Sequence, residues 1–270
     1  MDLFLRKTYK PGHAENRMKH EGDVQRARTL FYERGKRGNL YFLLSKRFGW
    51  MNEFIHAEDR GIEVGCGTGV SKEFISCRQY QITDFTDFDY LDFKNIDALN
   101  TGFANESFDF VVSSNMIHHV PYPVRFFEEM HRILKPGGKV LIQEINGSWC
   151  MRAILRLMRH EGYSYDVNVF DRNMICTDPE DLWSANCVIP NLLFDNRAKF
   201  NQQIQGFEVR KASYSEFFTF LNSGGVIAKT AHLPLSGFLL KICWAVDDLL
   251  CKIAPGMFAL QRQIVLEKKA

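Results

Sequence analysis

Three glycines at alternate positions, in the stretch GIEVGCGTG at residues 61–69, limit the folds open to this chain more than any other feature. A short apolar run that contains Glu63 leads into Gly65, Gly67 and Gly69. Glycine adopts backbone conformations that other residues avoid, and it lets a ligand approach the main chain closely. The pattern therefore predicts a strand, a tight loop and a helix, with a ligand held at the loop.

Strand and helix patterns alternate after this loop. Further strands are predicted at 80–84, 93–98, 108–115, 139–145, 206–214 and 257–269, and the weakest of these signals is at 93–98. Helices are predicted around 40–48, at 70–76, from Pro123 to Gly137, from 177 onward and at 238–253. Strands that alternate with helices imply crossover connections and a mostly parallel sheet with both faces covered.

Composition and charge exclude several classes of protein. The formal net charge is +2, which gives no argument for a nucleic-acid partner. The seven cysteines are odd in number and show no CxxC spacing, so we expect neither a disulfide framework nor a zinc site, and a reducing compartment. The N-terminus lacks an apolar signal core, and no apolar run reaches the roughly 18 residues that span a bilayer. We expect a soluble, cytoplasmic protein.

The position of the acid Glu63 indicates what the loop binds. In dinucleotide-binding loops the third glycine comes one residue later than Gly69. A carboxylate beside a phosphate would repel it, whereas beside an ammonium group it attracts. The loop is therefore suited to a ligand with a cationic, amino-acid-like end.

The acid-x-Gly-x-Gly-x-Gly pattern resembles the first motif of the Rossmann-like (class I) AdoMet-dependent methyltransferases of small-molecule type. The resemblance implies that S-adenosyl-L-methionine is the cofactor, that Gly65 and Gly67 make room for its methionine part, and that Glu63 lies near its amino group. It also implies a ribose-binding acid at the end of the second strand. Asp84 stands there, about 20 residues beyond the loop, with Asp87 and Asp89 as rivals.

Later motifs extend the resemblance over residues 58–147. By resemblance, Asp97 and Ala98 contact the adenine, and EEMHRILKPGGKVLI matches the helix, turn and fifth strand of the family. Only 12 residues separate Asp84 from Asp97, so the intervening helix is expected to be short or absent. The expected cofactor-binding residues are Glu63, Gly65, Cys66, Gly67, Gly69, Asp84, Asp97, Ala98 and Asn115.

The segment SSNMIHHV suggests the chemistry. Amino methyltransferases of nucleic-acid bases carry Asn/Asp-Pro-Pro-aromatic at this point, and this chain does not. His118 and His119 lie at the carboxyl end of a strand, where open α/β sheets bind ligands, and a neutral imidazole is a base near pH 7. They are the catalytic candidates, His119 being nearer the loop; the alternative is that both only pack against the next turn. No metal-ligand cluster stands out.

Acceptor specificity is expected from segments outside the core. Candidate pocket groups are His160, Glu161, Tyr163, Tyr165, Asp166 and Asp171. The loop 221–226 is a candidate lid. The helix 238–253 carries an apolar stripe of Leu239, Ile242, Val246, Leu249 or Leu250, and Ile253. We expect that stripe to pack on the body, with weak peripheral membrane contact as the alternative.

The predicted fold is α/β: a Rossmann-like, doubly wound, mostly parallel seven-stranded sheet whose last strand is antiparallel, with helical cap insertions. One methyltransferase domain spans 1–270, divided into an N-terminal helical segment (1–57), a cofactor-binding core (58–147), a remaining strand with the acceptor cap (148–256) and a final strand (257–270). The predicted function is methyl transfer to a small-molecule acceptor, at oxygen. The acceptor is apolar, lipid-like or saccharide-bearing. Carbon methylation of a quinone- or polyketide-like ring, and a non-catalytic AdoMet-binding protein, are the alternatives.

Overall fold

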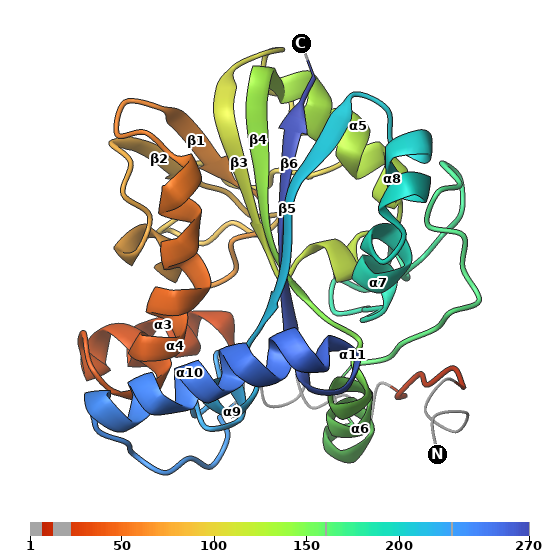
Figure 1. Ribbon diagram of the computed structural model, residues 1–270. Coiled ribbons are helices and arrows are strands. Elements are labelled where there is room, and N and C mark those ends of the chain that lie inside the picture. Colours follow the sequence, from red (N-terminus) through yellow and green to blue (C-terminus); the bar gives the residue numbers. More distant parts are fainter. Residues whose placement is uncertain (1–6, 13–22, 160, 228, 270) are drawn as a thin grey trace.

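The structure is a six-stranded sheet between helical layers, seen in a computed structural model that describes residues 7–12, 23–159, 161–227 and 229–269. The strands are β1 (Arg60–Glu63), β2 (Gln79–Ile82), β3 (Phe108–Ser114), β4 (Leu134–Ile145), β5 (Phe207–Ser215) and β6 (Gln261–Lys268). Their order is β2-β1-β3-β4-β6-β5 (Figure 1). The first four pair in parallel, and β6 is antiparallel to both its neighbours. The predicted α/β class and the antiparallel last strand are confirmed.

The predicted seventh strand, at 93–98, is wrong. This segment makes only isolated bridges, from Thr83 to Phe93 and from Asp97 to Asn100. Residues 83–107 contain no helix, as the short spacing predicted. A parallel strand needs a crossover of a dozen or more residues, usually a helix, to return to the same sheet edge. Without that helix the chain folds back as a loop beside β2.

Two helical layers cover the two faces of the sheet. One face carries α5 (Pro123–Ile133), α7 (Ile189–Phe194) and α8 (Arg197–Gln203), and the other carries α3 (Val24–Arg34), α4 (Gly38–Gly49) and the 3-10 helix η1 (Trp50–Phe54) (Figure 1). Alternate residues of β3 enter the two cores: Val111 packs toward α5, while Phe110 and Val112 pack toward α4. This two-sided burial explains why the centre of β3 has three consecutive apolar residues, at 110–112.

Four helices lie at one end of the sheet: α6 (Trp149–Met158), α9 (Phe218–Leu221), α10 (Gly237–Ile253) and α11 (Pro255–Phe258) (Figure 1). The 3-10 turns η2 (Val70–Glu73) and η3 (Ile117–His119) follow the glycine loop and β3. The helix expected from residue 177 is wrong. Carboxylates of Asp178 and Asp181 accept hydrogen bonds from the backbone N–H two residues on. Such local bonds offer the backbone an alternative to a helix.

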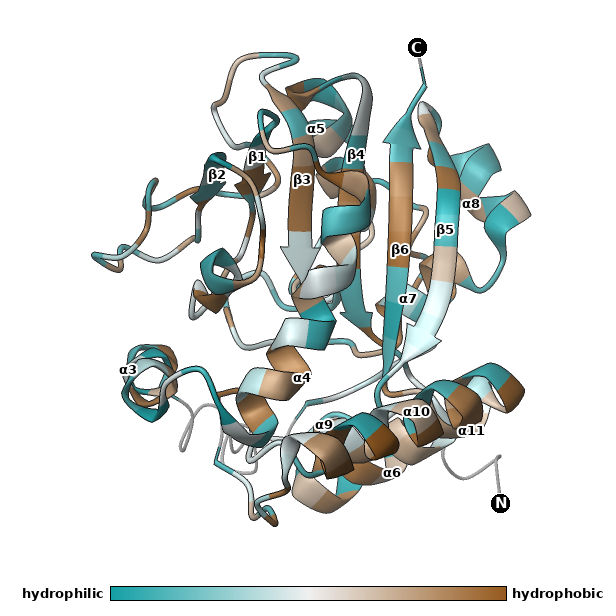
Figure 2. Ribbon diagram, turned by 60° about the vertical axis from the view of Figure 1, so that its left-hand side comes forward, coloured by the Kyte–Doolittle hydropathy of each residue, from teal (hydrophilic) through white to brown (hydrophobic). Residues whose placement is uncertain are grey.

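The stripe of α10 faces outward, so the expectation that it packs on the body is wrong. Its apolar positions are 40–73% exposed: Leu239, Ile242, Val246, Leu249 and Ile253. The opposite face, with Leu240, Asp247 and Cys251, is buried instead. Figure 2 shows the hydrophobic colouring on the helices at this end. No helix among the described residues is long and apolar enough to cross a membrane.

Candidate active site

The glycine loop lies at the carboxyl edge of the parallel strands. Gly65, Gly67 and Gly69 all have positive φ, at 63°, 52° and 61°. A Cβ atom at Gly65 would lie 2.4 Å from Cγ of Met116, so this glycine makes room for a protein side chain. A Cβ atom at Gly67 would meet nothing within 4 Å. The backbone at Gly67 therefore borders open space where a ligand can approach.

Asp84 is the acid that reaches this loop. Its carboxylate accepts a 2.8 Å hydrogen bond from the Gly67 backbone N–H and further bonds from Thr86. Its rival Asp89 is exposed and pairs with Lys94 at 2.7 Å. A carboxylate has capacity for more acceptor bonds than these, so Asp84 can also receive ligand hydroxyls.

The segment expected to contact adenine lies beside Asp84. The backbone N–H of Ile96 donates to the Asp84 carbonyl at 2.9 Å. Next along the chain, the Asp97 carboxylate accepts from the Leu99 backbone N–H, and Ala98 packs against the core. The loop that replaces the missing crossover helix therefore brings Asp97 and Ala98 close to Asp84, at the edge of the sheet where the glycine loop lies.

Two residues that sequence analysis missed cover the glycine loop. The Tyr90 hydroxyl donates to the Gly67 carbonyl at 2.6 Å, and the Arg28 guanidinium of α3 donates to the Thr68 carbonyl at 2.6 Å. Arg28 also lies 4.1 Å above the centre of the Tyr90 ring. The basic and aromatic content of the N-terminal segment was the available signal, but it did not show which residue meets the loop.

Glu63 is buried beneath the loop rather than presented at its surface. Its carboxylate accepts hydrogen bonds from Ser71, at the start of η2, and from the Tyr80 hydroxyl of β2. Burial raises the pKa of Glu63 to about 7, and these two bonds only partly oppose the shift. Its direct contacts therefore hold the glycine loop in place. Cys66, in the loop, donates its backbone N–H to the Thr83 carbonyl, and burial strongly raises the pKa of its thiol.

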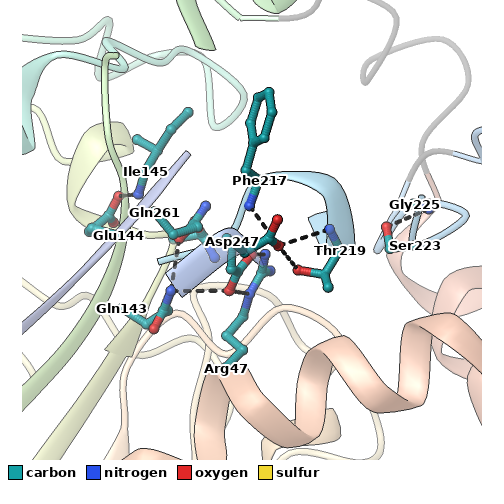
Figure 3. A network of polar contacts seen from close by, with 12 residues as sticks. Arg47, Gln143, Glu144, Ile145, Phe217, Thr219, Ser223, Gly225, Asp247 and Gln261 are labelled. Carbon is teal, nitrogen blue, oxygen red and sulfur yellow. Dashed lines mark hydrogen bonds and ion pairs between the residues drawn. The ribbon is translucent and has the colours of Figure 1, made fainter. Parts of the chain in front are cut away.

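Asn115 connects the loop region to a buried polar network. Its backbone has a φ of 50°, and its side-chain oxygen accepts from Gln261 on β6 at 2.9 Å. Gln261 in turn bonds Gln143, which bonds the buried ion pair between Arg47 of α4 and Glu216 (Figure 3). This network links Asn115 to β4, β6 and α4, which together fix the position of its side chain.

The two candidate histidines are both brought to the strand edge, on η3. His118 Nδ1 bonds the Glu144 carboxylate of β4 at 2.7 Å, and His119 Nδ1 bonds the Ser184 carbonyl at 3.0 Å. Burial lowers the pKa of His118, but the carboxylates of Glu144 and Glu161 outweigh it and leave that pKa raised. Burial and the neighbouring His118 lower the pKa of His119. Glu144 was not among the predicted site residues.

A pocket of about 580 Å³ lies next to the histidines. Its walls come from residues 10–12, 161–164, 167, 175–179, 181 and 183–186. Glu161 and Tyr163 line it as predicted, whereas Tyr165, Asp166 and Asp171 are not among its lining residues, and His160 lies outside the described residues. The side chain of Thr177 donates to the His119 carbonyl, so the pocket wall and the histidines are linked directly.

Comparison with known proteins identifies the core. Residues 62–142 match the sequence-family model of a methyltransferase domain. A ubiquinone biosynthesis O-methyltransferase of Stutzerimonas stutzeri is 29% identical over 117 residues, which cover 37% of this chain and 50% of that protein. A phthiotriol/phenolphthiotriol dimycocerosates methyltransferase of Mycobacterium ulcerans is 31% identical over 105 residues, which cover 33% of this chain and 38% of that protein. This chain thus spans half or less of the length of these relatives.

The fold is shared with a solved structure. A SAM-dependent methyltransferase from Archaeoglobus fulgidus matches with a TM-score of 0.52 over 89% of this chain and 99% of that one, at 17% identity. Residues 62–142 therefore form a methyltransferase domain with the Rossmann-like fold, and the cofactor that such a domain implies is S-adenosylmethionine. The residues present fit that group, because the space at Gly67 is open and Asp84 lies beside it.

Proposed function

We propose that this protein transfers the methyl group of S-adenosylmethionine to an oxygen atom of a small-molecule acceptor. The observation that carries the proposal is the open space at Gly67, with Asp84 bonded to the same loop. The buried His118 and the half-buried His119 lie at the same strand edge, since Met116, two residues before His118, packs on Gly65. Cofactor site and candidate acceptor-activating groups are thus neighbours.

The glycine loop and the strand edge hold the cofactor in this proposal. When bound, the cofactor supplies a methyl group on a positively charged sulfur. The residues assigned to its binding are Glu63, Gly65, Cys66, Gly67, Gly69, Asp84, Asp97, Ala98 and Asn115. Asp84 accepts hydrogen bonds from the ribose hydroxyls, and Gly67 leaves the space into which the ligand fits. Glu63 acts through the loop, because its carboxylate is bonded to Ser71 and Tyr80.

The pocket beside the histidines is the proposed acceptor site. Its volume of about 580 Å³ falls in the range of roughly 300–1,000 Å³ that small-molecule sites occupy. Its lining combines the apolar side chains of Val167, Ile175 and Trp183 with polar groups such as Asn186. Such a lining suits an acceptor with an apolar body and a polar head, in keeping with a lipid-like or saccharide-bearing compound.

His118 and His119 are proposed to activate the acceptor through the lone pairs on their Nε2 atoms. Their Nδ1 atoms are occupied by Glu144 and Ser184, which fix both rings. A base in a fixed position is needed because a hydroxyl must lose its proton before it attacks the methyl group. Carbon methylation of a quinone- or polyketide-like ring is the second candidate, favoured by the buried His118–Glu144 pair, which can also accept a proton from an acidic carbon.

The proposal also includes where the protein acts: in the cytoplasm, with weak peripheral contact to a membrane. The exposed stripe of α10 supports weak peripheral contact with a membrane, since large apolar surfaces on soluble proteins mark interaction sites. All seven cysteines are free, which supports residence in the reducing cytoplasm. Co-sedimentation with liposomes should be lost in a Val246→Asp variant of unchanged thermal stability; equal sedimentation of both proteins would remove the membrane contact from the proposal.

Methyl transfer is tested with methyl-labelled cofactor. The purified full chain is incubated with ¹³C-methyl S-adenosylmethionine and a panel of phenols, quinols, hydroxylated lipids and sugars. We expect label on one acceptor class, with the chemical shift of a methyl ether by NMR. A methyl group on carbon would select the second candidate. Binding of cofactor without transfer to any class would argue for the non-catalytic alternative.

A further inference from the structure

His118, His119 and Glu161 form one cluster, although Glu161 comes from the segment after α6. The three side chains offer ligand atoms that all lie within 4.8 Å of one another. His118 Nε2 lies 3.6 Å from one oxygen of the Glu161 carboxylate, and His119 Nε2 lies 3.9 Å from the other. The sequence analysis expected no metal ligands, because no local spacing joins Glu161 to the histidine pair.

The hydrogen bonds of the two rings determine which nitrogen atoms are available. The partners of the two Nδ1 atoms are a carboxylate on Glu144 and a backbone carbonyl on Ser184, and both can only accept. Each Nδ1 therefore carries the proton. In the neutral ring the lone pair is then on Nε2, and both Nε2 atoms face Glu161. Metal-binding histidines commonly show this arrangement, with the second nitrogen bonded to a carboxylate or carbonyl.

We propose that His118, His119 and Glu161 bind a divalent transition-metal ion, with Zn²⁺ as the best fit. Two ligand atoms at about 2.0–2.1 Å from a tetrahedral zinc lie about 3.4 Å apart. The observed separations of 3.6 and 3.9 Å, and the 4.8 Å within which all three ligand atoms lie, require the side chains to move inward by up to about 1.4 Å. Imidazole nitrogen favours zinc and its neighbours over Mg²⁺ or Ca²⁺, which take oxygen ligands.

The surroundings of the cluster are electrostatically suited to a cation. Glu144 is fully buried and Glu161 is nearly so, and together they place two carboxylates around the two imidazoles. The Cys187 thiol donates a hydrogen bond to Glu161 at 3.2 Å.

The site is held rigidly and opens toward the acceptor pocket. The backbone N–H of Asn186 donates to the His118 carbonyl, and the Thr177 hydroxyl donates to the His119 carbonyl. Glu161 lines the 580 Å³ pocket. Three protein ligands leave a tetrahedral ion one position for an external oxygen, as in catalytic zinc sites.

The role of the ion in catalysis rests on the proposed function. An acceptor hydroxyl bound to the ion has a lowered pKa and loses its proton to solvent water. Its oxygen then forms the new O–CH₃ bond while the sulfur–methyl bond of the cofactor breaks, and the sulfur leaves as a neutral thioether. The histidines act here as ligands, and the ion takes the place of a general base.

Metal binding is tested directly, without acceptor or cofactor. The full chain is stripped with a chelator and titrated with Zn²⁺ by calorimetry, and with Co²⁺ while its visible absorption is recorded. We expect one ion per chain and a Co²⁺ spectrum of tetrahedral intensity. His119→Gln and Glu161→Gln should each weaken Zn²⁺ by more than the roughly 10- to 100-fold that loss of an outer partner costs. The surface variant His56→Gln should bind as the unmodified chain does.

Cofactor titrations on the same proteins separate this inference from the proposed function. Circular dichroism identifies any variant that fails to fold, and Glu161→Gln is the second variant because it keeps the size of the side chain. Zn²⁺ binding without S-adenosylmethionine binding would leave the metal site standing and overturn the proposed function. Cofactor binding without Zn²⁺ or Co²⁺ binding would overturn the metal site. The same conclusion would follow if both site variants bound Zn²⁺ as tightly as the unmodified chain does.

Discussion

Helices α5 and α10 have similar sequence signals and opposite environments. In α5 the apolar positions Phe127, Met130 and Ile133 are fully buried against the sheet. In α10 the apolar stripe faces outward, with Ile253 73% exposed. The period of the apolar residues predicts that each segment is a helix, but it does not determine which face a neighbour covers.

A polar anchor sets the rotation of α10. The buried Asp247 carboxylate accepts hydrogen bonds from the backbone N–H groups of Phe217, Phe218 and Thr219 and from the Thr219 hydroxyl (Figure 3). Leaving these donors unpaired in the interior costs about 1–3 kcal/mol each. These bonds therefore hold the Asp247 face inward and leave the apolar stripe outside. Helix α5 also carries a buried carboxylate, Glu129, which accepts from the backbone N–H and hydroxyl of Thr101, but there the apolar stripe is buried together with it.

The largest expected effect comes from removing one apolar side chain from each helix. Phe127→Ala should lower the free energy of unfolding by about 3–5 kcal/mol, because it leaves a cavity among Phe194, Phe200 and Phe207. Ile253→Ala should change it by less than about 0.5 kcal/mol. Urea denaturation measures both, and equal losses in the two variants would show that α10 is covered after all.

Removing the anchor should be the next largest effect. Asp247→Ala should cost on the order of 3 kcal/mol, because the donors of residues 217–219 lose their shared acceptor. The adjacent Asp248 is exposed and pairs only with Lys252, so Asp248→Ala should cost under about 1 kcal/mol. If thermal unfolding ranks the two variants in the opposite order, Asp247 does not set the orientation of the helix.

The cofactor side of the molecule also has a buried carboxylate, and its stabilising effect depends on pH. Glu63 has a pKa of about 7 in the folded chain against 4.5 for the ordinary side chain. Its contribution is therefore complete below pH 4.5 and is lost as the pH rises through 7. At 1.36 kcal/mol per pKa unit the loss is about 3 kcal/mol.

The variant Glu63→Gln removes this titration. The free energy of unfolding of the variant, relative to that of the unmodified chain, should rise by about 2.5 kcal/mol between pH 5 and pH 8, because part of the Glu63 contribution is already lost at pH 5. Urea denaturation at the two pH values measures the difference, and the exposed Glu58→Gln is the control, which should show no such change. A pH-independent difference for Glu63→Gln would mean that Glu63 is ionised throughout.

The parts of the site that could be predicted are those encoded by local spacing. The glycine loop, Asp84 and the strand that precedes His118 each follow from a short pattern, and the structure places them at one edge. The contacts that could not be predicted join distant segments. Arg28 meets the loop from α3, and Glu161 meets the histidines from beyond α6. No local period records such meetings, because they depend on how layers pack.

The two errors in the predicted fold have a different cause. The segment 93–98 has strand-forming residues, but the chain before it is too short for a crossover helix. The segment from 177 has a helix-start pattern, but Asp178 and Asp181 bond the backbone locally instead. In both places a competing local or topological requirement outweighed intrinsic propensity.

The most direct test of the account is calorimetric titration of S-adenosylmethionine into two matched glycine variants. Gly67 and Gly137 both have positive φ, at 52° and 75°, and a Cβ atom at either position meets nothing within 4 Å. Leucine imposes the same kind of backbone strain at both, but only at position 67 does it fill the proposed cofactor space. We expect that Gly137→Leu binds like the unmodified chain and that Gly67→Leu, still folded by circular dichroism, shows no binding heat. Equal binding by the two variants would contradict it.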